Sequence, residues 1–185
     1  MKKVTAESIR NIFYSGQFGF VGDQEITSEI AFLVNNDYLL LSPVTIATKQ
    51  QYLETSSNTT VLFSHDEASG GGHAHVALKI LAQTYLKNEY GIDCVFEQPF
   101  VGFIPDVQST DKRIICECGH TNNPEKLFTY FRHPKVLYVI QIPYPSEEDT
   151  SVIGYEFQAQ PNFTSFLDFK STEKTQAIKD ILNRR

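Results

Sequence analysis

The chain has 185 residues, which is the length of one ordinary domain, and its hydrophobic fraction of 41% argues against a disordered protein. No apolar run approaches the length of a membrane span, and residues 1–13 lack the apolar core of a signal peptide, so we expect a cytoplasmic protein with no membrane partner. The net charge of -6 argues mildly against nucleic acid as a partner, although carboxylates around a metal would make this sum more negative than the surface that a ligand meets.

Residues 1–65 are expected to form an N-terminal extension or a small accessory subdomain. Residues 5–14 carry apolar side chains at helical spacing and predict a short helix. In residues 28–46, the turn signal Asn35-Asn36-Asp37 separates a helix-like half from a strand-like half, and residues 59–64 predict another strand. We expect this part of the chain to recognise substrate, mediate dimerisation or complete a sheet.

Residues 66–145 are expected to form the core of the protein. After a glycine loop at 70–72, residues 73–91 predict an amphipathic helix that ends at Gly91. Strand-like runs follow at 92–102, 103–109 and 113–121, then a helix over 122–133 that begins at Asn123 and Pro124, and a buried strand over 135–144. The order helix, strand, strand, strand, helix, strand predicts an α/β fold in which helices flank a mixed central sheet. Residues 146–185 are expected to form a C-terminal segment, where Ser171 or Thr172 opens a terminal helix with a basic end.

Two acidic residues stand out in this core. Asp106 follows a proline, and Glu117 interrupts the apolar run of residues 114–118. Burying an ionised carboxylate is costly unless a cation or hydrogen bonds compensate it. Mg²⁺ takes oxygen ligands, and one or two carboxylates are enough when water and substrate phosphate supply the rest. Either this strand end is open to solvent or a cation lies there, and Asp106 and Glu117, on neighbouring strands, are the carboxylates able to supply ligands to Mg²⁺ or Mn²⁺.

The order of elements, with "PDV" on the second strand and "IICECG" on the third, resembles the PD-(D/E)XK nuclease superfamily. The resemblance covers roughly residues 73–144. It implies a restriction-endonuclease-like core and a Mg²⁺-dependent nuclease that hydrolyses phosphodiester bonds, with DNA favoured over RNA and a homodimer suggested by family analogy. In such a site, Asp106 and Glu117 would hold the metal, and Cys118 would offer its backbone carbonyl.

The chain departs from this family at the motif lysine. Two residues after Glu117, where the lysine is expected, stands Gly119. The ammonium that orients water and offsets charge would then come from a neighbouring helix. Lys126, which follows the third strand, is the first candidate for this catalytic role, and Lys79 is the second.

A narrower resemblance concerns the helix before the strands. The stretch "HVALKILAQTYL", followed by "CVFEQPF", "PDV" and "CEC", is similar to the competence-protein branch known as CoiA-like. On that pattern His75, Lys79 and Glu97 join the site, with His75 and Glu97 completing the metal shell or positioning water.

Two other interpretations use the same residues. If no lysine reaches the acids, the chain would be a catalytically inactive nuclease-fold protein that binds nucleic acid or another protein. Cys116, Cys118 and His120 alternate along a strand and suggest zinc, but three consecutive residues on one face of a straight strand lie too far apart to bind one ion. The two cysteines would otherwise pack as small apolar groups.

Overall fold

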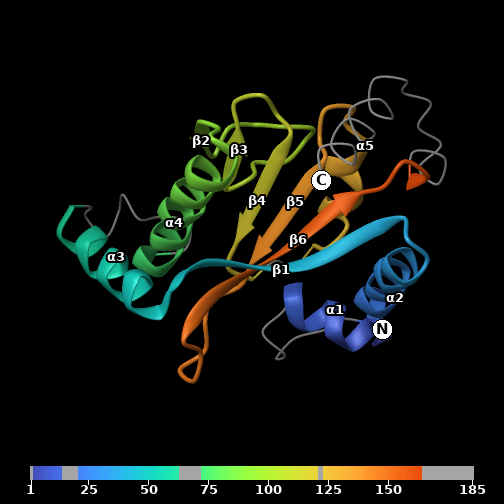
Figure 1. Ribbon diagram of the computed structural model, residues 1–185, viewed down its shortest axis with the longest axis horizontal. Helices are drawn as coiled ribbons and strands as arrows, with labels where there is room; N and C mark the ends of the chain where they lie inside the picture. The colour runs from blue at the N-terminus through green and yellow to red at the C-terminus, as the bar shows by residue number, and fades with distance from the viewer. Residues whose placement is uncertain (1, 14–20, 63–71, 121–122, 164–185) are drawn as a thin grey trace.

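The computed structural model describes residues 2–13, 21–62, 72–120 and 123–163. Within these ranges the chain forms an α/β structure with five helices and one six-stranded open sheet, which confirms the predicted class (Figure 1). The helices are α1 (Ala6–Phe13), α2 (Val21–Asn35), α3 (Lys49–Leu62), α4 (Gly72–Tyr90) and α5 (Lys126–Arg132). The strands are β1 (Leu39–Thr48), β2 (Cys94–Phe96), β3 (Val107–Ser109), β4 (Ile114–Cys118), β5 (Tyr138–Ile142) and β6 (Ser151–Ala159).

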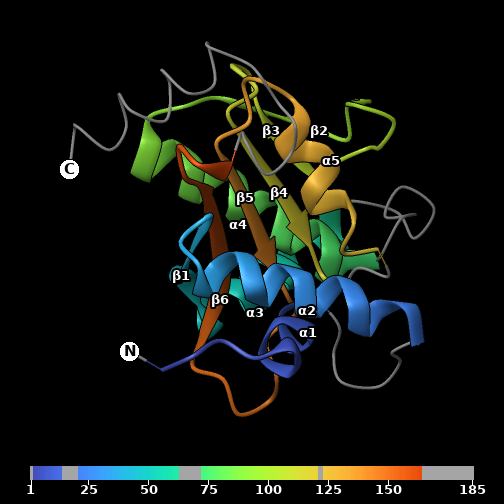
Figure 2. The same cartoon turned by 90° about the vertical axis from the view of Figure 1, so that its right-hand side faces the viewer.

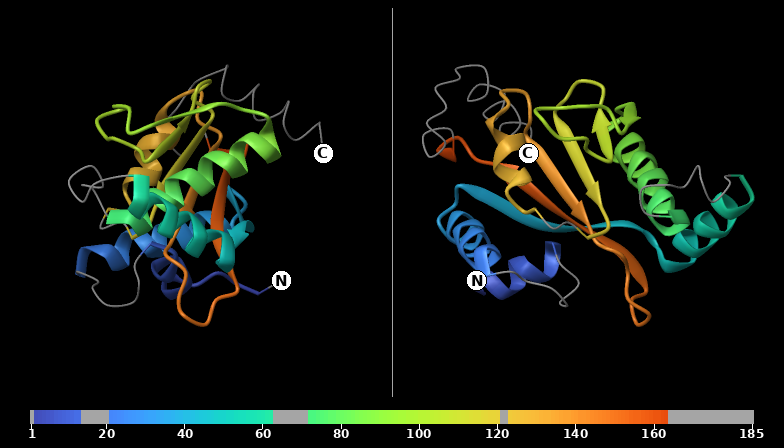
Figure 3. Two further views of the ribbon diagram at one scale, coloured as in Figure 1. Left: turned by 90° about the vertical axis from the view of Figure 1, so that its left-hand side faces the viewer. Right: turned by 180° about the vertical axis from the view of Figure 1, so that it is seen from behind.

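The sheet is mixed, as predicted. Its strand order is β1-β6-β5-β4-β3-β2, with β4 and β5 parallel and the other neighbouring pairs antiparallel. Along the chain the elements run α4, β2, β3, β4, α5, β5, which confirms the predicted order. Parallel strands need a crossover connection, and α5 lies in the connection between β4 and β5. Helix α4 covers one face of this region and α5 the other (Figures 1 and 3).

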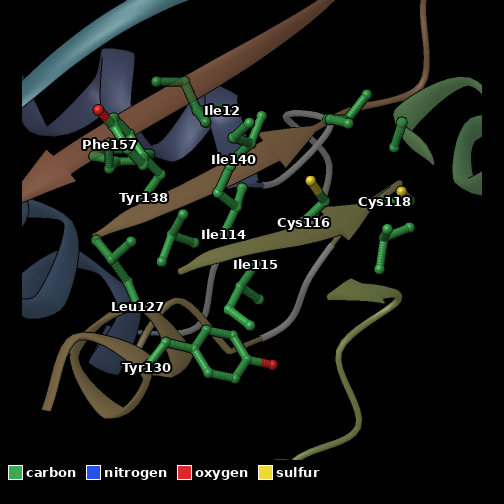
Figure 4. Close-up of a cluster of buried hydrophobic side chains, with 14 of the residues drawn as sticks. Ile12, Ile114, Ile115, Cys116, Cys118, Leu127, Tyr130, Tyr138, Ile140 and Phe157 are labelled. Atoms are coloured by element: carbon green, nitrogen blue, oxygen red, sulfur yellow. The ribbon is translucent and has the colours of Figure 1, made fainter. Parts of the chain in front are cut away.

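The centre of the sheet is covered on both faces. All residues of β4 and β5 are buried, which explains why both strands are nearly continuous apolar runs. In Figure 4, Ile115 points toward Tyr130 of α5, whereas Cys116 and Cys118 project from the other side of β4. Glu117 is therefore the charged exception in a strand that is otherwise part of the apolar core.

The N-terminal region belongs to the same sheet. β1 pairs with β6 along its length, from Leu39 opposite Ala159 to Thr48 opposite Ser151. Helices α1 and α2 pack together beside this part of the sheet (Figure 2). The predicted turn between a helix and a strand is confirmed, with Asp37 at φ 60° between α2 and β1. β6 is not among the predicted strands. Its pairing with β1 places the N-terminal and C-terminal parts of the described chain in one sheet.

The strand predicted at residues 59–64 is wrong, because residues 59–62 belong to α3 and residues 63–64 lie outside the described ranges. The Thr48 hydroxyl accepts a hydrogen bond from the Gln51 backbone N–H at 3.1 Å, and Gln51 Oε1 accepts one from the Thr48 N–H at 2.8 Å. This reciprocal cap starts α3, and cooperative propagation carries the helix through its β-branched residues.

The two helices predicted between residues 73 and 133 are present. Gly91, at φ 65°, follows the last residue of α4 as predicted, whereas α5 begins at Lys126, two residues later than the expected Pro124. The terminal helix predicted from Ser171 or Thr172 lies outside the described residues. Among the helices that the structure describes, none combines the length and the apolar character needed to cross a bilayer.

Candidate active site

The three predicted acids lie in one row, with Glu97 one residue after β2, Asp106 one residue before β3 and Glu117 in β4. Val107 in β3 is opposite Cys116 in β4. One further step of this antiparallel register places Asp106 opposite Glu117. On the other side of Asp106, the Glu97 backbone N–H donates to the Asp106 carbonyl at 3.3 Å, which continues the row past the end of β2. Strand pairing thus brings Glu97, Asp106 and Glu117 to the same end of the sheet.

The Asp106 carboxylate is held at both oxygens. Its Oδ1 lies 2.8 Å from Nε2 of His75 on α4, and its Oδ2 accepts a hydrogen bond from the Cys118 backbone N–H at 2.7 Å. The second ring nitrogen of His75, Nδ1, lies 3.3 Å from the Tyr144 hydroxyl. Both ring nitrogens of His75 thus have protein partners in this structure, Asp106 at Nε2 and Tyr144 at Nδ1.

Glu117 is an acid in an environment that disfavours its charge. Its side chain is 10% exposed, the Tyr130 hydroxyl donates to Oε1, and Lys126 Nζ lies 3.5 Å from both carboxylate oxygens. Burial, together with the nearby charge of Asp106, raises the pKa of Glu117 to about 7 in spite of the lowering effects of Tyr130 and Lys126. The two carboxylates are thus near enough to interact, and a cation between them would favour both charges.

Two lysines approach the row from different helices. Lys79 Nζ on α4 donates to Glu97 Oε1 at 2.8 Å; the Lys79 side chain is 10% exposed and that of Glu97 is 51% exposed. Lys126, the first residue of α5, reaches Glu117, and its Nζ lies 5.5 Å from the centre of the Phe103 ring. Both candidate lysines are therefore in contact with predicted site acids, Lys126 with Glu117 and Lys79 with Glu97.

The backbone at position 119 leaves no room for a lysine. Gly119 has φ 79°, a conformation that residues with a side chain rarely adopt. A Cβ added there would lie 2.7 Å from Cε2 of Tyr144, which is closer than nonbonded carbon atoms approach. The Tyr144 ring thus occupies the space that the first side-chain atoms of a lysine would need.

Sequence reasoning missed three polar residues of this site. Gln141 interrupts the apolar run of β5 as Glu117 does in β4, and the two are paired across the strands, so the same signal could have found it. Its Nε2 donates to the Gly119 carbonyl at 2.8 Å. Tyr130 follows Lys126 by one helical turn, and this spacing is also visible in the sequence. Tyr144 has no such signal.

No three His, Cys, Asp or Glu side chains in the described ranges form a group that could hold a metal ion by themselves. A Mg²⁺ site would therefore have two carboxylates, with water and substrate completing the shell. The zinc interpretation gains no support, because Cys116 and Cys118 are buried and burial raises the pKa of both thiols well above the ordinary value. The three cysteines are free, and the two in β4 are part of the apolar core.

No family model, no curated protein and no solved structure matches this chain. The row and its neighbours bring together three acids, a histidine and two lysines at one end of the sheet, which is a set of groups suited to binding a cation and a phosphate.

Proposed function

We propose that this chain is a metal-dependent nuclease of the PD-(D/E)XK type that hydrolyses phosphodiester bonds, in DNA rather than RNA. The observation that carries the proposal is that Asp106, one residue before β3, and Glu117 in β4 lie at the same end of these paired strands, where the Cys118 backbone N–H donates to Asp106 Oδ2. These are the two acids that the resemblance assigns to metal binding. The element order and the parallel crossover from β4 through α5 to β5 support a restriction-endonuclease-like core.

The donor atoms suit Mg²⁺ or Mn²⁺. Each carboxylate oxygen can accept more than one bond, so Asp106 and Glu117 keep acceptor capacity beyond their contacts with His75, Tyr130 and backbone. The Cys118 carbonyl would be a third oxygen ligand. When bound, the cation would lower the pKa of its water and offset charge on the phosphate. Glu117 would then remain ionised near neutral pH in spite of its burial.

Each neighbouring group has a distinct role in this proposal. Lys126 is the ammonium nearest Glu117 and takes the place of the lysine missing at Gly119, offsetting negative charge as the phosphate is attacked. Lys79 holds Glu97, whose half-exposed carboxylate is able to accept a hydrogen bond from a metal-bound water. His75 orients Asp106.

A second function is favoured by a specific observation. Each acid of the row already has a protein partner that is cationic or a hydrogen-bond donor: Lys79 for Glu97, His75 for Asp106, and Lys126 with Tyr130 for Glu117. Because these partners already provide hydrogen bonds or positive charge to its acids, the row needs no metal to be stable. It would suit a catalytically inactive protein that uses the same fold to bind nucleic acid or another protein.

Cleavage assays separate the two functions. We expect the purified chain to cut DNA in Mg²⁺ or Mn²⁺ and not in EDTA, tested on single-stranded, duplex and branched DNA and on RNA. Asp106→Ala and Glu117→Ala should each abolish cleavage while far-UV circular dichroism stays unchanged. Asp93→Ala is the matched control, because Asp93 is an exposed acid paired with a lysine at the far end of α4.

Three outcomes decide the assignment. Cleavage that survives both Asp106→Ala and Glu117→Ala would show that the site is elsewhere. Binding of DNA without cleavage by the unaltered chain would select the inactive binding protein. Loss of cleavage in Asp93→Ala as well would show that the assay reports general damage rather than the site.

A further inference from the structure

A closed set of contacts surrounds the Asp106 carboxylate. From Oδ1 it runs through the His75 ring at 2.8 Å to the Tyr144 hydroxyl at 3.3 Å. The Tyr144 ring lies directly over Gly119. Gly119 follows Cys118, whose backbone N–H donates to Oδ2 of the same carboxylate at 2.7 Å. Asp106 is thus held from two directions by groups that meet at Tyr144.

The chemistry of these groups determines where the hydrogens lie. An ionised carboxylate only accepts hydrogen bonds, so Nε2 of His75 must carry the hydrogen that points to Asp106. In the neutral ring Nδ1 is then an acceptor, and the Tyr144 hydroxyl must donate to it. Burial raises the pKa of Tyr144 to about 12, so the phenol keeps this hydrogen at neutral pH. A phenylalanine at this position would leave Nδ1 without its donor.

Gly119 controls where the Tyr144 ring can lie. An added Cβ would come within 2.7 to 2.9 Å of three Tyr144 atoms, Cε2, Cζ and the hydroxyl oxygen. The hydroxyl oxygen is the atom that contacts His75 Nδ1. Other glycines with positive φ do not face this restriction: Gly91 at φ 65° and Gly102 at φ 86° have nothing within 4 Å of an added Cβ. Space, and not only backbone conformation, therefore requires glycine at position 119.

We propose that Tyr144 is a positioning residue of the candidate site: seated on Gly119, it holds the His75 ring and through it fixes the Asp106 carboxylate in the orientation that binds the metal. The effect on metal affinity rests on the proposed function, because Asp106 is there a ligand. The effect on the His75 ring does not rest on it. A supporting group of this kind typically changes metal affinity by about 10- to 100-fold when it is removed.

The test uses the full chain with Tyr144→Phe, Gly119→Ala and the double variant. Gly91→Ala is the control for positive-φ strain without contact. Long-range ¹H–¹⁵N spectra report the Nδ1 resonance of His75. Titration with Mn²⁺ alone measures metal affinity. We expect both single variants to shift the Nδ1 resonance and to weaken Mn²⁺ binding about tenfold, and Gly91→Ala to do neither.

The double variant gives the sharpest result, because Tyr144 and Gly119 act on the same ring. Its loss of Mn²⁺ affinity should equal the larger of the two losses seen in the single variants. Multiplied losses would show that the two residues act separately and would overturn the proposal. An unchanged Nδ1 resonance in Tyr144→Phe would also overturn it. If the resonance shifts as expected but the unaltered chain binds no Mn²⁺, the positioning of His75 stands and the nuclease proposal fails.

Discussion

Glu117→Gln should remove a pH dependence from the stability of the metal-free protein. The pKa of Glu117 is raised from 4.5 to about 7, chiefly by burial, so the folded state holds this proton more tightly than the unfolded state does. The contribution to the free energy of unfolding is therefore fully present below pH 4.5, falls as the pH rises, and is lost above about pH 7. Glutamine has no proton to lose and should show no such change.

The expected size follows from the same two values. The interval from 4.5 to about 7 corresponds to roughly 3 kcal/mol, at about 1.4 kcal/mol for each pKa unit. Relative to Glu117→Gln, the unaltered protein should thus lose about 3 kcal/mol between about pH 4.5 and 8 in EDTA. Mg²⁺ at about 100 times its dissociation constant should restore a similar amount, about 2.7 kcal/mol, at pH 8. Urea unfolding followed by circular dichroism measures these differences.

The comparison with a control makes this prediction refutable. Glu54→Gln removes an exposed glutamate from α3 and should leave the pH profile of the unaltered protein in place. Subtracting the free energies of unfolding of two variants cancels the contribution of every other titrating group that the two proteins share. A difference between the unaltered protein and Glu117→Gln that stays flat from about pH 5 to 8 would refute the burial of an ionisable Glu117.

Four further variants test other parts of the structure. Lys126→Ala should slow cleavage about a hundredfold and Lys79→Ala less, since Lys126 is the cation beside Glu117; equal, unaffected rates would remove both lysines from the mechanism. Val101→Gly should raise the free energy of unfolding in urea by about 1 kcal/mol, because Val101 has φ 46°; a decrease would contradict the strain. Tyr130→Phe should lower the free energy of unfolding by about 1–2 kcal/mol at pH 8 and not at pH 4, because it deprives the ionised Glu117 of a donor; equal losses at both pH values would contradict this.

Local patterns predicted most of the elements around the row, and their failures have identifiable causes. The run 135–144 became a buried strand because its apolar residues are continuous, and α4 ends before Gly91 because glycine adopts positive φ readily. The error at residues 59–64 arose because β-branched residues indicate a strand only when no helix is already propagating through them. β6 was missed because its alternating buried positions include Gly154 and Glu156, so burial alternates along the first residues of the strand but apolar character does not.

The amino-acid sequence by itself determined the class of the fold, the order of the elements from α4 to β5 and the presence of one acid beside β3 and one in β4, because these depend on short-range spacing and on the tendency of consecutive strands to pair. Only the tertiary structure decided which groups surround those acids. Tyr130, Tyr144 and the two lysines reach the row because of how α4, α5 and the segment after β5 pack against the sheet. Such packing depends on side-chain shapes across the whole core, and no local pattern encodes it.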